Sequence, residues 1–288
     1  MPKRRRKTAQ DRADERQRMR DLKRIERAIA DRLSLALKDK IRRIEAISDA
    51  TWNAAVDGEP PEELKETDIA ERREWPPLVE QLSNVGRLVH LAARMDPIDE
   101  EQIRTELLRA RRDAYESELE IQAGLVGCLG QRARLTSGPS LTTLNDMSQR
   151  DAVSIVNTYN YDLAVRIAAI QQEAPTANRH VYAYRLRSWF GERNKQKKPA
   201  IAMYTANTAR TLAQQDFYQF NRALMGTAHL EPLDAVCPVC IGWVKRGEVP
   251  MQVALNNASP FHNLCPHLWV TNPVRVPKDE CPNLWMGG

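Results

Sequence analysis

The sequence predicts a mainly α protein, in which an elongated body of several helices is followed by a small C-terminal module of loops and a β-hairpin. Two observations lead to this prediction. Apolar residues recur every three or four positions through most of the first 225 residues, which is the pattern of amphipathic helices. From Glu231 onward this period is lost and prolines become frequent, so the end of the chain is expected to fold differently.

The first predicted helix covers residues 10–57. Its apolar stripe begins at Met19 and continues through Ile25 and Ile44, while charged residues fill the other faces. The helix should end at Asp57, because the glycine and the two prolines that follow it cannot continue a helix. Further helices are expected at residues 78–95, 98–133, 140–172, 176–191 and 200–225, the last two separated by Gly191, Asn194 and Pro199.

These elements group into three predicted parts. They are a basic arm with the long N-terminal helix (1–57), a helical body (78–226) and a cysteine- and histidine-containing module with a tail (231–288). The last part is too short to bury much core, so we expect a bound metal to replace that core. No apolar run approaches the ~20 residues that span a bilayer, and no membrane partner is expected.

The C-terminal part contains two pairs of metal-binding residue types. Cys237 and Cys240 form a C-x-x-C pair, and after twenty-one residues His262 and Cys265 form an H-x-x-C pair. Two such pairs separated by a short segment have the spacing of a tetrahedral zinc site, and the segment between them is expected to fold back as a hairpin. His267 is an alternative ligand. The sequence therefore predicts a module stapled by structural Zn²⁺.

Other interpretations of these residues are less favourable. A redox C-x-x-C pair belongs at a helix N-terminus within a βαβ pattern, and no such pattern is present. A disulfide needs an oxidising compartment, and the start of the chain does not resemble a secretory signal. A zinc enzyme needs an open coordination position, which four protein ligands do not leave. The chain also lacks the nucleotide-binding, hydrolase and zinc-deaminase motifs, so we expect no enzyme activity.

The N-terminus is strongly basic. Residues 1–24 hold eleven Lys or Arg and four acids, a surplus of seven, whereas the whole chain has a net charge of +5. Such an arm attracts polyphosphate through counterion release, which favours non-specific contact with double-stranded DNA over a solvated terminus or a nuclear localisation signal. The residues expected near DNA are Lys3, Arg4, Arg5, Arg6, Lys7, Arg12, Arg16 and Arg18.

Three motifs follow one another late in the chain. They are a helix bearing Thr205, Thr208, Ala209 and Arg210, then Cys237-Pro-Val-Cys240, and then the segment from Pro260 to His267. This order resembles the Mu F-like minor head proteins of tailed bacteriophages, over about residues 200–270, roughly a quarter of the chain. The resemblance places Cys237, Cys240, His262 and Cys265 at metal-type positions. His267 stands where the family usually has its last cysteine, so either histidine can complete the ligand set.

The resemblance implies a structural virion protein of the head interior or portal region. Such a protein assists head morphogenesis or the packaging and ejection of DNA, and it is in the host cytoplasm during assembly. Its expected partners are portal and other capsid proteins and packaged double-stranded DNA, with no small-molecule substrate. The alternative is a zinc-containing nucleic-acid-binding regulatory protein. Against it, the segment between the two ligand pairs has only Lys245 and Arg246 as phosphate contacts, and no recognition helix is evident.

Overall fold

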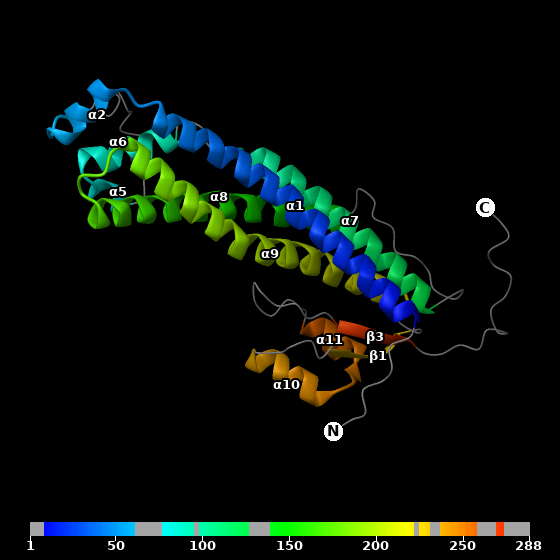
Figure 1. Ribbon diagram of the computed structural model, residues 1–288. Helices are drawn as coiled ribbons and strands as arrows, with labels where there is room; N and C mark the ends of the chain where they lie inside the picture. The colour runs from blue at the N-terminus through cyan, green and yellow to red at the C-terminus, as the bar shows by residue number, and fades with distance from the viewer. Residues whose placement is uncertain are drawn as a thin grey trace. The chain divides into compact units, whose positions relative to one another are not determined.

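The structure, a computed structural model, describes residues 9–60, 77–94, 98–126, 139–221, 225–230, 237–257 and 269–273. Helices account for 85% of the described residues, so the predicted mainly α class is confirmed (Figure 1). The chain forms two compact units, and each is assembled from segments that are distant in sequence. Unit 1 comprises Met1–Ala28, Thr105–Ser148 and Lys198–Gly288, and unit 2 comprises Ile29–Arg104 and Gln149–Lys197. This grouping differs from the three parts expected along the sequence, because the long helices contribute residues to both units.

Two helices replace the single helix predicted over residues 10–57. They are α1 (Ala9–Glu45) and α2 (Asp49–Val56). Ser48 starts α2, because its hydroxyl accepts a hydrogen bond from the backbone N–H of Thr51 at 3.1 Å. The end of α2 agrees with the sequence: Asp57 caps it and Gly58 has a φ of 90°.

Four further helices cover the ranges where three were predicted, because the single helix predicted over residues 78–95 is two helices with a break at residues 81–83. They are α5 (Pro77–Glu80), α6 (Asn84–Arg94), α7 (Glu100–Val126) and α8 (Pro139–Glu173). The predicted extension of α7 to residue 133 lies outside the described residues. Polar side chains stabilise the starts of two of these helices. The Ser83 hydroxyl accepts from Gly86 N at 3.3 Å, and Asp99 Oδ1 accepts from Gln102 N at 2.9 Å.

A single helix, α9 (Arg179–Phe220), spans the region where two helices were predicted. The predicted break at Gly191 to Pro199 is therefore wrong. A proline in a helix interior removes one backbone donor and costs about 3 kcal/mol. Buried side chains on both sides of Pro199, among them Phe190 and Ala202, provide packing that offsets this cost.

The core of unit 2 is rich in aromatic side chains. Trp52 of α2 meets the Tyr182 ring of α9 edge-on, with 5.9 Å between the ring centroids. Tyr159 of α8 stacks on Phe190 at 6.3 Å, and its hydroxyl donates to Asn194 Oδ1 at 2.5 Å. These contacts join the two helices that bring residues 149–197 into this unit.

The helical core of unit 1 is packed differently. Four fully buried alanines recur on one face of α9, namely Ala202, Ala206, Ala209 and Ala213. Larger buried side chains of α7, such as Tyr115 and Leu119, complete the core. A face of small residues allows neighbouring helices to approach closely, so polar side chains on the same helices can reach one another across the unit.

The C-terminal part of unit 1 contains a three-stranded antiparallel sheet in the order β2-β1-β3. The strands are β1 (Met225–Leu230), β2 (Val249–Pro250) and β3 (Trp269–Pro273). The central strand places Ala228 opposite Val249 of β2 and Leu230 opposite Trp269 of β3. The predicted final helix is five residues too long, because α9 ends at Phe220 and not at residue 225. Strand β1 begins at Met225, so the sheet starts before the predicted boundary at residue 231.

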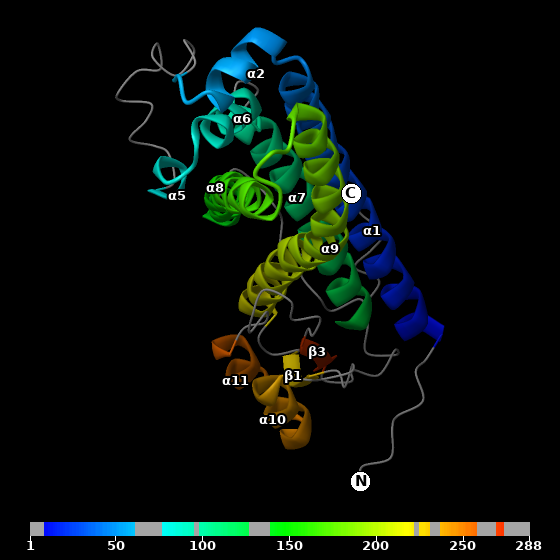
Figure 2. The same ribbon diagram turned by 60° about the vertical axis from the view of Figure 1, so that its left-hand side comes forward.

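Two short helices lie beside this sheet: α10 (Pro238–Arg246) and α11 (Met251–Asn256) (Figures 1 and 2). The prediction of a hairpin between the two ligand pairs is wrong, because residues 241–257 form most of α10, strand β2 and helix α11. The chain passes from β1 through α10 before it reaches β2, so these neighbouring strands are not joined by a turn. Helices of nine and six residues are too short to show a clear apolar period.

Candidate metal centre and basic helix face

The first ligand pair lies at the N-terminal end of α10. Cys237 is the residue that precedes the helix, with φ −80° and ψ 130°, and Pro238 is the first helical residue. Cys240 follows in the first turn and is completely buried. Residues at these two positions project toward the same end of a helix, as they do in a capping box. Both cysteines are free thiols.

The surroundings of Cys237 favour its thiolate form. The backbone amide of Cys240 lowers the pKa of the Cys237 thiol, and the amide of Val239 and the Cys240 side chain act in the same direction. Neither amide completes a capping hydrogen bond. A thiolate is the form of cysteine that binds metal, so this end of α10 has the chemistry of one half of a metal site.

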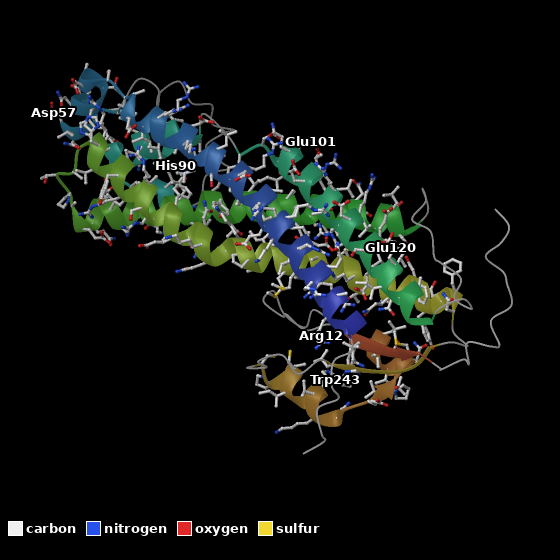
Figure 3. All side chains as sticks on the ribbon, turned by 45° about the vertical axis from the view of Figure 1, so that its right-hand side comes forward. Arg12, Asp57, His90, Glu101, Glu120 and Trp243 are labelled. Atoms are coloured by element: carbon white, nitrogen blue, oxygen red, sulfur yellow. The ribbon has the colours of Figure 1, made fainter. Side chains whose placement is uncertain are left out.

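A pair of tryptophans joins α10 to the start of β3. Trp243 lies on α10 (Figure 3), one turn after Cys240, and it meets the ring of Trp269 edge-on at 5.3 Å and 77°. The indole N–H of Trp269 donates to the carbonyl of Asn257 at 2.9 Å. Residues 257 and 269 are therefore bonded to each other beside α10. Residues 258–268 come between them in the sequence.

Three of the five predicted ligands are in that segment. His262, Cys265 and His267 lie outside the described residues, so their positions relative to Cys237 and Cys240 stay a prediction. Within the described part of the chain, no group of three or more His, Cys, Asp or Glu side chains is arranged to hold a metal ion.

A buried polar cluster joins the sheet to the helices of unit 1. At its centre is Glu118 of α7, whose side chain has no exposed surface. Its Oε1 accepts from Gln122 at 2.7 Å and from Gln214 at 2.9 Å, and the same Gln214 amide donates to the carbonyl of Trp269 at 2.9 Å. Arg18 of α1 donates from Nη2 to Oε1 at 2.9 Å and from Nε to Oε2 at 3.0 Å. We call these residues, with Asp21 and Arg210, the Glu118 cluster.

Arg210 of α9 completes the link to α1. Its Nη2 donates to the backbone carbonyl of Arg18 at 2.9 Å and lies 3.9 Å from the carboxylate of Asp21. Burial lowers the pKa of Arg210 to about 10, while the charge of Glu118 opposes this shift and that of Arg18 adds to it. The side chain stays charged at neutral pH. The cluster therefore contains buried charges of both signs, contributed by α1, α7 and α9.

The structure divides the predicted DNA-proximal residues into three groups. The run from Lys3 to Lys7 lies outside the described residues. Arg12 and Arg16 are exposed on α1, with Arg12 near its N-terminal end (Figure 3). Arg18 points to the opposite side of the helix, where its side chain is 19% exposed and paired with Glu118. Arg18 thus has a buried partner that the sequence did not reveal.

The set of DNA-proximal residues chosen from the sequence stopped at Arg18 and left out the residues that continue the exposed basic face. Arg20, Lys23 and Arg27 are exposed and follow Arg12 and Arg16 along α1. Their spacing of three or four residues was present in the sequence, and a helical projection of residues 12–27 separates them from Arg18. The Glu118 cluster had no comparable signal, because its members come from three distant segments.

Comparison with known proteins finds no matching family model, no significantly similar curated protein and no significantly similar solved structure. The resemblance to the Mu F-like proteins therefore rests on the motif residues alone. No helix within the described ranges is both long enough and apolar enough to cross a membrane.

Proposed function

We propose that this chain is a structural protein of a tailed-bacteriophage head, of the kind formed by the Mu F-like minor head proteins, and not an enzyme. It lies in the head interior or near the portal, and it is in the host cytoplasm during assembly. Its partners are portal and other capsid proteins and packaged double-stranded DNA, which it contacts without sequence specificity. A single structural zinc ion holds its C-terminal module together.

The observation that carries this proposal is the contact of Trp269 with Trp243, which brings the start of β3 to α10. His267 precedes Trp269 by two residues, which is at most about 7 Å of extended chain. Cys240 and Trp243 are one helical turn apart, about 5 Å along the axis. Because Trp269 contacts Trp243, a donor two residues before Trp269 is compatible with the cysteine pair, and the positions of His262 and Cys265 stay a prediction from the spacing.

The donor set fits zinc and a structural role. Three cysteines and one histidine form one of the tetrahedral sets that bind structural Zn²⁺. When bound, zinc supplies a cross-link between the start of α10 and the segment that leads into β3. Gln214 already connects β3 to the helices through the carbonyl of Trp269. The metal and this hydrogen bond together give a small module a fixed place in unit 1, which it has too little core to maintain alone.

Metal analysis tests the zinc site. Protein purified without chelator should contain about one zinc per chain. Cys240→Ser should lose the metal and increase hydrogen exchange in residues 237–257, whereas Cys128→Ser, the matched control outside the ligand pairs, should keep it. His262→Ala and His267→Ala then identify the fourth ligand, because only one of the two should release zinc. Metal-free wild-type protein, or equal zinc content in the two cysteine variants, would contradict the site.

Mass spectrometry of purified phage particles tests the structural role. The chain should be recovered in intact heads at a low and reproducible copy number, and it should co-purify with portal assemblies. A regulatory protein should instead be found only outside particles, as a free monomer or dimer with sequence-dependent affinity for DNA. That outcome would replace the head-protein proposal with the regulatory alternative.

A further inference from the structure

Five exposed cations form a continuous stripe along α1 in unit 1. They are Arg12, Arg16, Arg20, Lys23 and Arg27. Their successive spacings of four, four, three and four residues place them within an arc of about 80° and along about 22 Å of helix axis. We call these five residues the basic stripe.

The charges of the basic stripe are not neutralised within the described part of the protein. Arg20 donates to the neutral side-chain oxygen of Gln17 at 2.6 Å. No acidic partner for the other four lies among the described side chains. The cations on other faces of the same helix differ, since Arg18 pairs with Glu118 and Arg24 with Asp113, each at 2.9 Å.

The acids of this part of α1 whose side chains the structure describes lie on other faces. Asp21 projects about 180° from Arg12 and is buried in the Glu118 cluster. By the same projection Glu26 falls outside the arc of the basic stripe. Among the described side chains of residues 12–27, one face of α1 therefore has positive charge alone, and the opposite face provides the packing that holds the helix in place.

We propose that the basic stripe binds the phosphate backbone of double-stranded DNA along the length of α1. This inference rests on the proposed function and names a surface for its DNA contact. A duplex has one negative charge per about 1.7 Å of axis, so a row of cations about 4–6 Å apart meets phosphates along its whole length. Contacts of this kind are independent of base sequence.

Two other anionic partners fit the stripe less well. Proteins that bind single-stranded nucleic acid stack bases on aromatic side chains, and residues 9–28 contain none. Helices that bind membrane surfaces insert an apolar face, whereas the apolar side chain of Ile25 is buried in the protein core. Met19 is the one large apolar side chain that is exposed among the described side chains of residues 9–28. The basic stripe therefore has positive charge without aromatic side chains for base stacking and without an apolar face for membrane insertion, and this combination favours a DNA duplex as the partner.

The test compares two variants of the zinc-loaded full chain that lose the same charge. The stripe variant carries Arg16→Gln, Arg20→Gln and Lys23→Gln. The control variant carries Lys38→Gln, Lys195→Gln and Lys197→Gln, which are cations of unit 2 with no ionic partner in the described structure. Fluorescence anisotropy measures the affinity of each for a duplex of about 30 base pairs at several salt concentrations.

We expect the salt dependence of DNA binding to become weaker in the stripe variant and to stay unchanged in the control variant. Removing three phosphate contacts should reduce the log–log slope by about 2.7, so the affinity lost between about 50 and 200 mM salt becomes about 40-fold smaller. The control variant should keep the wild-type slope. Arg16→Lys with Arg20→Lys should keep it too, because both charges remain. Circular dichroism should report the same helix content in all proteins.

Three results would overturn the proposal. They are an unchanged slope in the stripe variant, an equal change in the control variant, and tighter binding to single-stranded DNA or to phosphatidylglycerol vesicles than to the duplex. Deleting residues 2–7 measures the separate contribution of the arm. Zinc content and recovery in particles do not depend on the stripe, so failure here leaves the proposed function standing. Conversely, loss of the head-protein proposal would leave duplex binding as an independent result.

Discussion

Removing Arg18 should destabilise unit 1 far more than removing an arginine two residues away. Arg18→Ala deletes two hydrogen bonds, of 2.9 and 3.0 Å, to a carboxylate that has no exposed surface. Breaking a buried ion pair by removing one partner costs about 3–5 kcal/mol, because the other charge is left buried. Glu118 keeps two amide donors and Arg18 is itself 19% exposed, so we expect a loss of about 2–3 kcal/mol.

Removing the charge of the other partner, Glu118, should reduce the free energy of unfolding by a smaller amount. Glu118→Gln removes the buried charge and keeps the side-chain shape, and the guanidinium of Arg18 can turn toward solvent. We expect a loss of about 1–2 kcal/mol. The double variant should lose less than the sum of the two single variants, by about 1 kcal/mol or more, because the residues interact directly. Arg18→Ala should be the more destabilising of the two single variants, because it leaves the charge of Glu118 buried, whereas Glu118→Gln leaves an arginine that is partly exposed.

Urea unfolding measured by circular dichroism gives the free energies, and hydrogen exchange locates the effect. Protection should fall in residues 9–28 and 105–126, the two helical segments that the pair joins. Arg20→Ala is the matched control, since Arg20 is exposed and its partner is the neutral Gln17. Its effect should be within about 0.5 kcal/mol. Equal losses of stability for Arg18→Ala and Arg20→Ala would refute the reasoning, because the cluster would then contribute no more than a surface contact.

Two further predictions concern buried polar groups. Burial lowers the pKa of His90 to about 4, and the charges of Arg94 and Lys40 act in the same direction. The unfolded state, with a pKa near 6.5, therefore binds more protons between pH 6.5 and 4, so stability should fall by about 2 kcal/mol from pH 7 to pH 5. Urea unfolding at both pH values should show this loss reduced in His90→Gln but retained when the exposed His180 is changed to Gln. Gln214→Leu should cost about 2–3 kcal/mol, because it removes one donor from the buried carboxylate of Glu118 and the hydrogen bond that joins α9 to the carbonyl of Trp269. Hydrogen exchange at residues 269–273 should rise in this variant and not in Gln149→Leu, whose bond to Glu100 is exposed; equal exchange in both would contradict an anchoring role.

The helical class and most helix positions were predictable from sequence because they depend on local pattern. Burial of Ile25 and Ile44 follows from spacing along α1, and the end of α2 follows from Gly58. The apolar pattern gave the wrong prediction where an apolar side chain is exposed or a charged side chain is buried. Met19 was assigned to the buried stripe but is 49% exposed, whereas the neighbouring Asp21 is 5% exposed. A charged residue can occupy the buried face only when the fold brings it a partner.

The candidate metal site was predictable only in part. Residue type and spacing identified Cys237 and Cys240, and the structure places them at the start of α10. The contact of Trp269 with Trp243 and its bond to Asn257 had no signal in the sequence, because they join residues that are many positions apart.

The sequence by itself determined the amphipathic helices, the cysteine and histidine spacing and the excess of positive charge at the N-terminus. The tertiary structure decided that α9 continues through Pro199 and that β1 pairs with the distant β3. It also decided that Arg18 pairs with the buried Glu118, whereas Arg16 is exposed to solvent. The physical reason is range. Periodicity, capping and charge density act over a few residues, whereas burial and ion pairing depend on which distant segments the fold brings together.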